Sequence, residues 1–322
     1  MGTMWSDIRY EYYRANSVVR IAMWNIAIYI LVNLISVPIY LSGVPYIKFV
    51  HFIQEWFYLP SDPMKLLVRP WTLISYMFMH ASIWHLIFNM LVLYWFGRIT
   101  NDLIHNNKIL PLYFLGGFAG ALLFLISFNA FPVFWNSGSV PLVGASAAVM
   151  AILLSAATLN PQGHIRFILI GAVELQYVAL AMVVIDVLSI PFTNPGGHFA
   201  HLGGAIMGWF FIFMLRRGID MGAPIRAILT FLSDPGSIRR SRSRKKRSPK
   251  ISSRKAPETV TSDTGNNSGK STDGYGRSFS QRYRNMTTEE CVDAILDKIN
   301  TYGYISLTDE EKDFLAKSSK KK

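Results

Sequence analysis

Four polar side chains lie in otherwise apolar stretches and are of types that together can attack a carbonyl group. Ser146 lies in "PLVGASAAVMAILL", His201 in "AHLGGAIMG", and His85 and Asn89 in "HASIWHLIFN". A serine hydroxyl becomes a useful nucleophile when a base takes its proton, and a neutral imidazole is the usual base. We therefore expect His201 to activate Ser146, while His85, Asn89 and a backbone N–H at a helix start stabilise the oxyanion.

Six apolar segments carry these residues, and each is about as long as the ~20 helical residues that cross a hydrocarbon core, although the fourth and sixth are short. They are residues 18–41, 73–96, 109–128, 142–159, 167–190 and 199–215. Of the 322 residues, 51% are hydrophobic and 16% charged. We therefore expect an all-α fold, a polytopic membrane bundle of six transmembrane helices whose first span is retained rather than cleaved as a signal.

Ser146, His85 and His201 share one depth in this expected bundle. They lie 13 to 15 residues before the polar residues that mark the cytoplasmic ends of their segments, Asn160, Arg98 and Arg216 respectively, which corresponds to about 20 to 22 Å of helix. Asn89 lies one helical turn beyond His85 on the same face. In a core of about 30 Å, this level is below the outer surface but within reach of water. The shared depth favours one catalytic set over unrelated polar residues.

Each of these residues also has a purely structural interpretation. A serine among small residues in a span commonly packs a helix interface, and a membrane histidine commonly bonds a neighbouring helix. Several histidines raise the possibility of zinc, but the sequence has no HExxH pattern and no acidic or thiol ligand is expected at this depth. We therefore predict no metal and no cofactor.

Two acidic residues of the fifth segment, Glu174 and Asp186, raise the alternative of a proton relay in a transporter. They are twelve residues apart, which corresponds to ~18 Å of rise and a rotation mismatch of roughly 120°. We interpret Asp186 as an interfacial residue and assign no role to Glu174, whose structural alternative is a buried hydrogen-bond partner. No discontinuous helix pair or repeat supports a transporter.

The motifs resemble those of the rhomboid family of intramembrane serine proteases. The matching pieces are "HASIWHLIFN" in the second segment, "GASAAV" in the fourth and "AHLGGAIMG" in the sixth, and the resemblance covers about residues 20 to 216. It implies a rhomboid-like bundle that hydrolyses peptide bonds in or near substrate transmembrane helices without a metal or cofactor. It also implies Ser146 as nucleophile, His201 as general base and acid in a dyad without a third acidic member, and His85 with Asn89 as oxyanion donors.

The resemblance assigns Gly204 and Gly208 to a small-residue seam that brings the sixth helix against the fourth, in agreement with small-xxx-small packing. The chain departs from the family pattern at Ala147, where glycine is usual, and at Met150, where an aromatic residue often packs on the imidazole. The family's Trp-Arg pair in the first loop has no obvious match.

The distribution of Lys and Arg predicts both termini in the cytoplasm. Residues before 216 carry nine of the 32 Lys and Arg, placed mainly at the amino end and in the second and fourth loops. We expect an integral membrane protein of the bacterial cytoplasmic membrane.

The chain divides into four predicted parts. They are a cytoplasmic segment 1–17, a membrane domain 18–216, a basic and largely disordered linker 217–281, and a small helical hairpin 282–322. The linker is basic enough to attract anionic lipid headgroups, which we favour over nucleic acid. The hairpin has two capping-box patterns, Thr287 with Glu290 and Thr308 with Glu311.

The sequence thus predicts an intramembrane serine protease whose partners are single-span membrane-protein substrates. A second possibility is a rhomboid-like pseudoprotease that binds membrane clients without cutting them. Both the serine and the histidine are present, which favours the protease.

Overall fold

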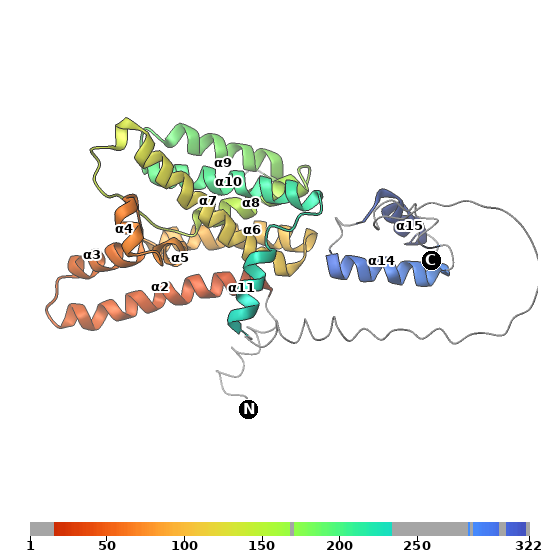
Figure 1. Cartoon of the computed structure of the whole chain (residues 1–322), viewed down its shortest axis with the longest axis horizontal. Helices are drawn as coiled ribbons and strands as arrows, with labels where there is room; N and C mark the ends of the chain where they lie inside the picture. Colours follow the sequence, from red (N-terminus) through yellow and green to blue (C-terminus); the bar gives the residue numbers. More distant parts are fainter. Residues whose placement is uncertain (1–15, 168–170, 234–282, 284–285, 303–306, 320–322) are drawn as a thin grey trace, which may run out of the picture. The chain divides into compact units, whose positions relative to one another are not determined.

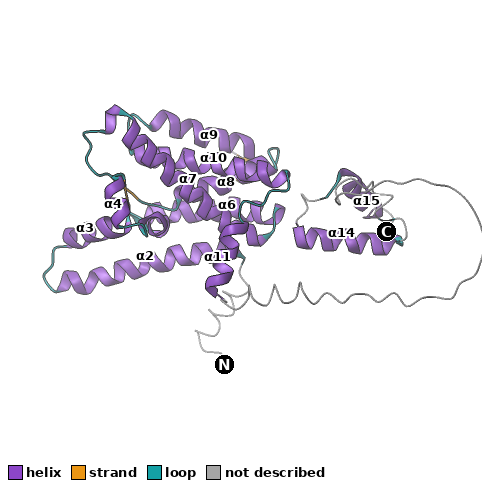
Figure 2. Ribbon diagram, viewed as in Figure 1, coloured by secondary structure: helices purple, strands orange, loops and turns teal. Residues whose placement is uncertain are grey.

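The computed structural model describes residues 16–167, 171–233, 283, 286–302 and 307–319 (Figure 1). Most of this part of the chain is helical, as expected (Figure 2). Contacts divide the chain into two units, one that holds the apolar helices and one that holds the tail helices. Each unit is described by itself below.

The apolar unit is built on six longer helices. These are α2 (Ser17–Leu41), α6 (Ile83–Leu103), α7 (Ile109–Ala130), α8 (Ser146–Leu159), α9 (Leu175–Ser189) and α10 (Pro195–Arg216). Shorter elements connect them: α3 (Tyr46–Phe57), β1 (Leu59–Pro60), α4 (Pro63–Val68), α5 (Thr72–Ser75), η1 (Tyr76–Phe78), η2 (Asn106–Lys108), η3 (Pro132–Phe134), β2 (Pro141–Leu142), β3 (His164–Phe167) and β4 (Gly171–Glu174). Helix α11 (Ala223–Ser233) follows α10.

Three stretches of the described chain are helical, long and apolar enough to cross a membrane: α2, Asn106–Ala130 and α10. A fourth is obtained if Thr72–Phe78 and Ile83–Leu103, which meet at a 90° bend, are counted as one span. Helices α8 and α9 are apolar but have only 14 and 15 residues, about 21 and 22 Å against a core of about 30 Å. The structure therefore shows a helical protein with three or four candidate spans, and six spans stay a prediction.

Two of the expected segments are not continuous helices. The second, 73–96, is interrupted between η1 and α6, where the Ser82 hydroxyl accepts a hydrogen bond from the His85 N–H and caps α6. The fifth, 167–190, begins as a β-hairpin in which Phe167 pairs with Gly171, and α9 begins only at Leu175. Apolar composition alone does not distinguish a helix from a short strand followed by a helix.

Helix α8 forms the core of the apolar unit. Ten of its fourteen residues are buried, and it contacts α6, α7 and α10. The closest approach is to α10, because a Cβ atom added at Gly204 would lie 1.9 Å from the Ala147 carbonyl oxygen, and one at Gly208 would lie 2.1 Å from that of Ala151. These are the two glycines that the resemblance assigns to the seam. Only glycine lets the two backbones meet at this distance.

The irregular chain before α8 is held by hydrogen bonds to distant segments. Strand β2 pairs antiparallel with β1, with Leu142 opposite Leu59, and the Gly144 N–H donates to the Tyr76 carbonyl at 3.0 Å. Irregular backbone at membrane depth is tolerated when the protein itself satisfies its polar groups. The short length of α8 is therefore compatible with a buried position.

The first loop is ordered around a buried arginine. Arg69 is 7% exposed, lies over the Trp56 ring at 5.6 Å, and pairs with the Glu55 carboxylate at 3.3 Å. Trp56 also stacks on Trp71, with the ring centroids 6.0 Å apart. The sequence shows no adjacent Trp-Arg pair here, but folding brings a tryptophan and an arginine together from α3 and the end of α4.

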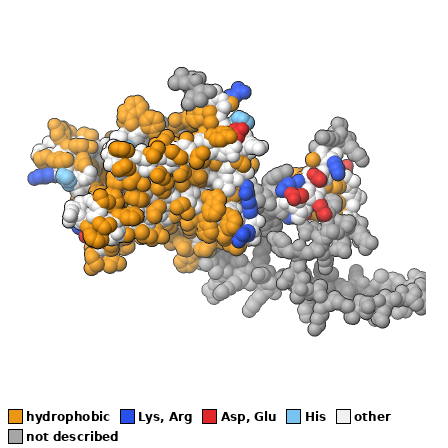
Figure 3. All heavy atoms as spheres, turned by 90° about the horizontal axis from the view of Figure 1, so that it is seen from above, with side chains coloured by type: hydrophobic (Ala, Val, Ile, Leu, Met, Phe, Trp, Pro, Cys, Tyr) orange, Lys and Arg blue, Asp and Glu red, His pale blue; other side chains and the backbone are white. Residues whose placement is uncertain are grey.

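The surface of the apolar unit is largely hydrophobic. Large apolar side chains on several helices are more than half exposed, such as Leu31, Trp84 and Leu188. Figure 3 shows one broad hydrophobic face, with Lys and Arg side chains at its margins. Apolar patches of this size are rare on proteins surrounded by water, and they suit contact with lipid.

The tail contains α14 (Thr288–Tyr302) and α15 (Asp309–Ser319). Both expected capping boxes are confirmed. The Thr287 N–H donates to the Glu290 carboxylate at 2.8 Å and the Glu290 N–H returns a bond to the threonine hydroxyl at 3.3 Å. Thr308 and Glu311 form the same pair at 2.8 and 3.3 Å. Helix α11 occupies 223–233, at the start of the largely disordered linker expected over 217–281, and 234–281 lie outside the described residues.

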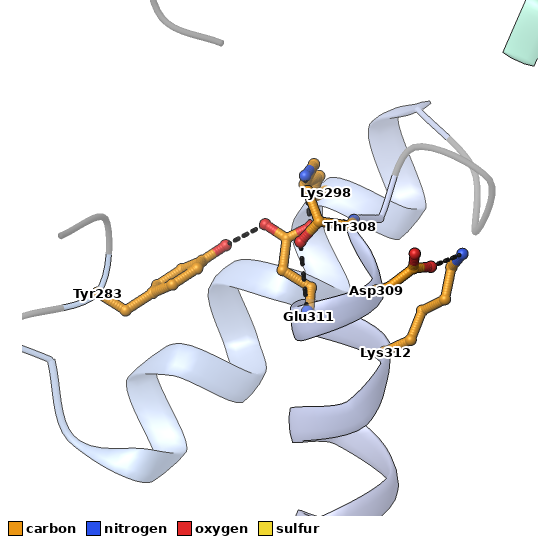
Figure 4. Close-up of polar contacts among 6 residues, drawn as sticks. All are labelled: Tyr283, Lys298, Thr308, Asp309, Glu311 and Lys312. Atoms are coloured by element: carbon orange, nitrogen blue, oxygen red, sulfur yellow. Dashed lines mark hydrogen bonds and ion pairs between the residues drawn. The ribbon is translucent and has the colours of Figure 1, made fainter. Parts of the chain in front are cut away.

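Glu311 links the parts of the tail (Figure 4). Its side chain is 1% exposed, and it accepts hydrogen bonds from Lys298 at 2.6 Å and from the Tyr283 hydroxyl at 2.9 Å. Burial by itself would raise the pKa of Glu311. The bonds from Lys298, the Thr308 N–H and Tyr283, with the charge of Lys298, outweigh that effect and lower the pKa to about 2.

The Gly204 contact predicts a specific cost of added volume. Gly204→Ala should destabilise the apolar unit by about 1–3 kcal/mol, because the new methyl group meets a backbone carbonyl that cannot move aside. Gly117→Ala is the matched control, since its methyl meets the flexible end of the Met77 side chain. Thermal unfolding of both variants in detergent tests this, and an equal loss in both would contradict it.

The low pKa of Glu311 predicts that the tail helices loosen in acid. Since ionised Glu311 is favoured in the folded state, its contribution is complete above the ordinary pKa of 4.5 and is lost as the pH falls from there toward about 2. Amide hydrogen exchange of residues 288–319 in the full chain, corrected for the intrinsic pH dependence, should show this loss. Glu311→Gln should remove the pH dependence, whereas Glu310→Gln, at an exposed neighbouring position, should keep it.

Candidate active site

Ser146 is the first residue of α8 and is half-buried, between the buried Ala145 and Ala147. The first N–H groups of a helix have no partner within the helix, and the helix dipole makes this end favourable for negative charge. The hydroxyl of Ser146 is therefore attached to the part of α8 that is best able to stabilise an oxyanion.

The imidazole of His85 lies beside this serine. Gly144 has φ +125°, and a Cβ atom added there would lie 2.8 Å from His85 Nε2 and 3.5 Å from Ser146 Oγ. The two side chains thus approach a common point next to Gly144, and a larger residue there would collide with the ring. His80, in the break before α6, packs edge-on against His85 with centroids 5.2 Å apart.

Asn89 is 7% exposed and lies one turn beyond His85. Its side-chain amide donates to the His85 carbonyl at 2.9 Å within the same helix. An asparagine amide has two hydrogens, so one remains for another acceptor.

His201 lies on α10, with 23% of its side chain exposed. Ala147 and Ala200, the residues next to Ser146 and His201, both come within 2.7 Å of the position that a Cβ on Gly120 would occupy. The structure therefore brings α8 and α10 together beside Ser146 and His201. Among the described residues, His201 makes no hydrogen bond to Ser146; its bond is to Asp186.

Asp186 is the residue that the sequence interpretation misplaced. We expected it at the membrane interface and expected His201 to have no acidic partner. Instead Asp186 is 4% exposed, and its Oδ1 lies 2.8 Å from His201 Nδ1 and 2.7 Å from His198 Nδ1. The sequence argument against zinc assumed that no acidic ligand lies at the depth of these histidines, and the position of Asp186 removes that argument.

The error arose from treating 167–190 as one helix. Glu174 is in strand β4, where it accepts a bond from Gln176 at 2.6 Å, so the helical rotation between Glu174 and Asp186 has no meaning. Counted from Leu175, where α9 begins, Asp186 lies about 17 Å along the helix. That value is closer to the ~20 to 22 Å expected for His201 than the roughly 28 Å obtained from Phe167, the segment start expected from the sequence.

Ala147 and Met150, the two departures from the family pattern, are both buried in α8. The Ala147 side chain lies against Gly120 of α7, where the two Cβ positions would be 2.5 Å apart. The methyl group is thus directed into the helix contact.

Residues 68–218 match the rhomboid domain. Residues 280–321, which hold the tail helices, match a separate family of unknown function, DUF6576. The first match includes α6 to α10 and every residue of the candidate site.

Three relatives each match slightly less than half of the chain. Presenilin-associated rhomboid-like protein A, mitochondrial, of Danio rerio is 28% identical over 160 residues, which are 48% of this chain and 40% of the relative. RHOMBOID-like protein 12, mitochondrial, of Arabidopsis thaliana is 29% identical over 157 residues, 46% of this chain and 47% of the relative. Inactive rhomboid-related protein 2 of Caenorhabditis elegans is 28% identical over 149 residues, which are 46% of this chain and 41% of the relative.

The chain spans less than half the length of these relatives. Two of them are named as mitochondrial, so the comparisons do not support the bacterial membrane that the sequence interpretation expected. The domain match and the names of the relatives agree on one conclusion: residues 68–218 of this chain are a rhomboid domain.

Proposed function

We propose that this protein is an intramembrane serine endopeptidase in which Ser146 is the nucleophile and His201 the general base and acid. His85, Asn89 and the N–H groups at the start of α8 stabilise the oxyanion. The substrates are membrane proteins with a single transmembrane helix, cut in or near that helix. Because a helix backbone is fully hydrogen-bonded, substrates with Gly, Pro or polar residues near the cut are favoured.

The observation that carries this proposal is the bond between His201 Nδ1 and Asp186 at 2.8 Å. A carboxylate at Nδ1 holds the proton on that nitrogen, which leaves the lone pair of Nε2 free to accept the serine proton. Asp186 then acts as a positioning residue that fixes the ring and its tautomer, and the proposed pair becomes a triad.

The reaction follows from these assignments. Ser146 Oγ attacks the substrate carbonyl carbon while its proton passes to His201 Nε2. The oxyanion accepts hydrogen bonds from the start of α8 and from the His85 and Asn89 side chains. His201 returns the proton to the leaving amine as the C–N bond breaks, and water then hydrolyses the acyl-enzyme by the same steps in reverse order. Catalytic hydrogen bonds are commonly long without substrate, which accommodates the missing Ser146–His201 bond.

Replacing the nucleophile or the base should abolish cleavage. Purified protein in liposomes should cut a model single-span substrate, and Ser146→Ala and His201→Ala should each lower the rate to background, on the order of 10³-fold or more. Product detection by mass spectrometry gives both the rate and the cut bond. Equal cleavage by either variant and the wild type would remove the mechanism.

Removing the charge of Asp186 should slow the chemical step without unfolding the protein. Asp186→Asn should lower kcat at least about tenfold with a smaller change in KM, because the imidazole loses its orientation and tautomer. The pH profile of kcat should also shift, which a purely structural role would not cause. Glu174→Gln, at the partly exposed β4 end of the same segment, is the control and should keep wild-type kcat.

A second candidate function is a client-binding protein that does not cut. The names of the relatives favour this function over cleavage. One name calls its protein inactive, and the other two names do not mention protease activity. Labelling of Ser146 by a fluorophosphonate separates the two functions. Binding of a single-span protein with neither labelling nor cleavage would support the client-binding function.

A further inference from the structure

The side chains of Asp186, His198 and His201 form a compact cluster between α9 and α10. One ligating atom from each lies within 4.8 Å of the others. The side chains of the histidines are 15% and 23% exposed, and that of Asp186 is 5% exposed. His198 and His201 are three residues apart on one face of α10, and Asp186 approaches them from α9. Figure 1 shows these two helices side by side.

The hydrogen bonds within the cluster leave one polar atom unsatisfied. Both imidazoles share Asp186 Oδ1, whereas Oδ2 is buried and has no hydrogen-bond partner among the described residues. A buried carboxylate oxygen without a partner is energetically costly. A cation bound by both oxygens of the Asp186 carboxylate would satisfy it.

We propose that Asp186, His198 and His201 bind a divalent zinc ion. Two imidazoles and one carboxylate are a known zinc ligand set that leaves a fourth position for water. Mg²⁺ and Ca²⁺ prefer sites made of oxygen atoms, so the two nitrogens select against them. On a tetrahedral zinc with ligand distances of about 2.0–2.1 Å, neighbouring ligand atoms are about 3.3 Å apart. The present separations of 2.7 and 2.8 Å would therefore widen by about half an ångström.

Zinc at this position would switch off the proposed base. A neutral imidazole that binds a metal through Nδ1 carries its proton on Nε2. The proton of His201 therefore moves from Nδ1 to Nε2, the nitrogen that must accept the Ser146 proton, and no net proton is gained or lost. This regulatory role rests on the proposed function, whereas zinc binding itself does not.

Binding is tested without any substrate. Zn²⁺ is titrated by calorimetry into untagged full chain in detergent, as the wild type and as Ser146→Ala. We expect one site in both. Even the loss of a residue that only supports a metal ligand costs 10- to 100-fold in affinity, so Asp186→Asn and His198→Ala should weaken binding at least tenfold. His164→Ala, at an exposed histidine of β3, should not.

Thermal unfolding without metal tests whether each variant is folded. If Asp186→Asn or His198→Ala does not fold, Asp186→Ser or His198→Gln takes its place. The absence of a single site in the wild type, or equal affinity in the Asp186 and His198 variants, would overturn the proposal.

Regulation is tested with the cleavage assay. Saturating Zn²⁺ should lower the wild-type rate at least tenfold, and EDTA should restore it. The rate of His198→Ala, compared with its own rate without metal, should respond only weakly to zinc. Zinc binding without inhibition would refute the regulatory role alone. If no variant cuts, the proposed function fails, and the calorimetry still decides whether the site exists.

Discussion

The contact between the backbones of α8 and α10 is the constraint on which the candidate site depends. Gly204 and Gly208 place α10 directly on the Ala147 and Ala151 carbonyls, and the Ser155 hydroxyl adds a bond to the Gly208 carbonyl at 3.0 Å. Ser146 and His201 extend from these same helices. In lipid, where apolar burial contributes little to helix association, such close packing is a main source of attraction. The same glycines thus serve stability and the geometry of the site.

A short, buried α8 resolves a conflict between chemistry and the membrane. A nucleophile needs a free hydroxyl, nearby backbone N–H groups and water, none of which lipid provides. Because α8 begins at Ser146, directly after an irregular but hydrogen-bonded segment, the hydroxyl and the first N–H groups of the helix lie among protein groups rather than in lipid. The cost is a helix that is shorter than the hydrocarbon core, and α6, α7 and α10 cover it.

The sequence predicted the parts of the fold that depend on long apolar segments and on local helix-capping residues. It placed α2 and α7 within two residues of their bounds, and it found both capping boxes from a threonine and a glutamate three residues apart. It did not predict the β3–β4 hairpin, because a short apolar strand and a helix start look alike. That mistake moved Asp186 out of the site. The pairing of Trp56 with Arg69 was also out of reach, since their contact depends on the path of the first loop.

The pairing of β1 with β2 has a mechanical consequence. Strand β1 follows α3, whose exposed side chains include Tyr46, Ile47 and Phe52, and β2 ends four residues before Ser146. A displacement of α3 would therefore reach the segment before Ser146 through two short, paired strands. The start of α8 thus depends mechanically on a segment that is far from it in sequence.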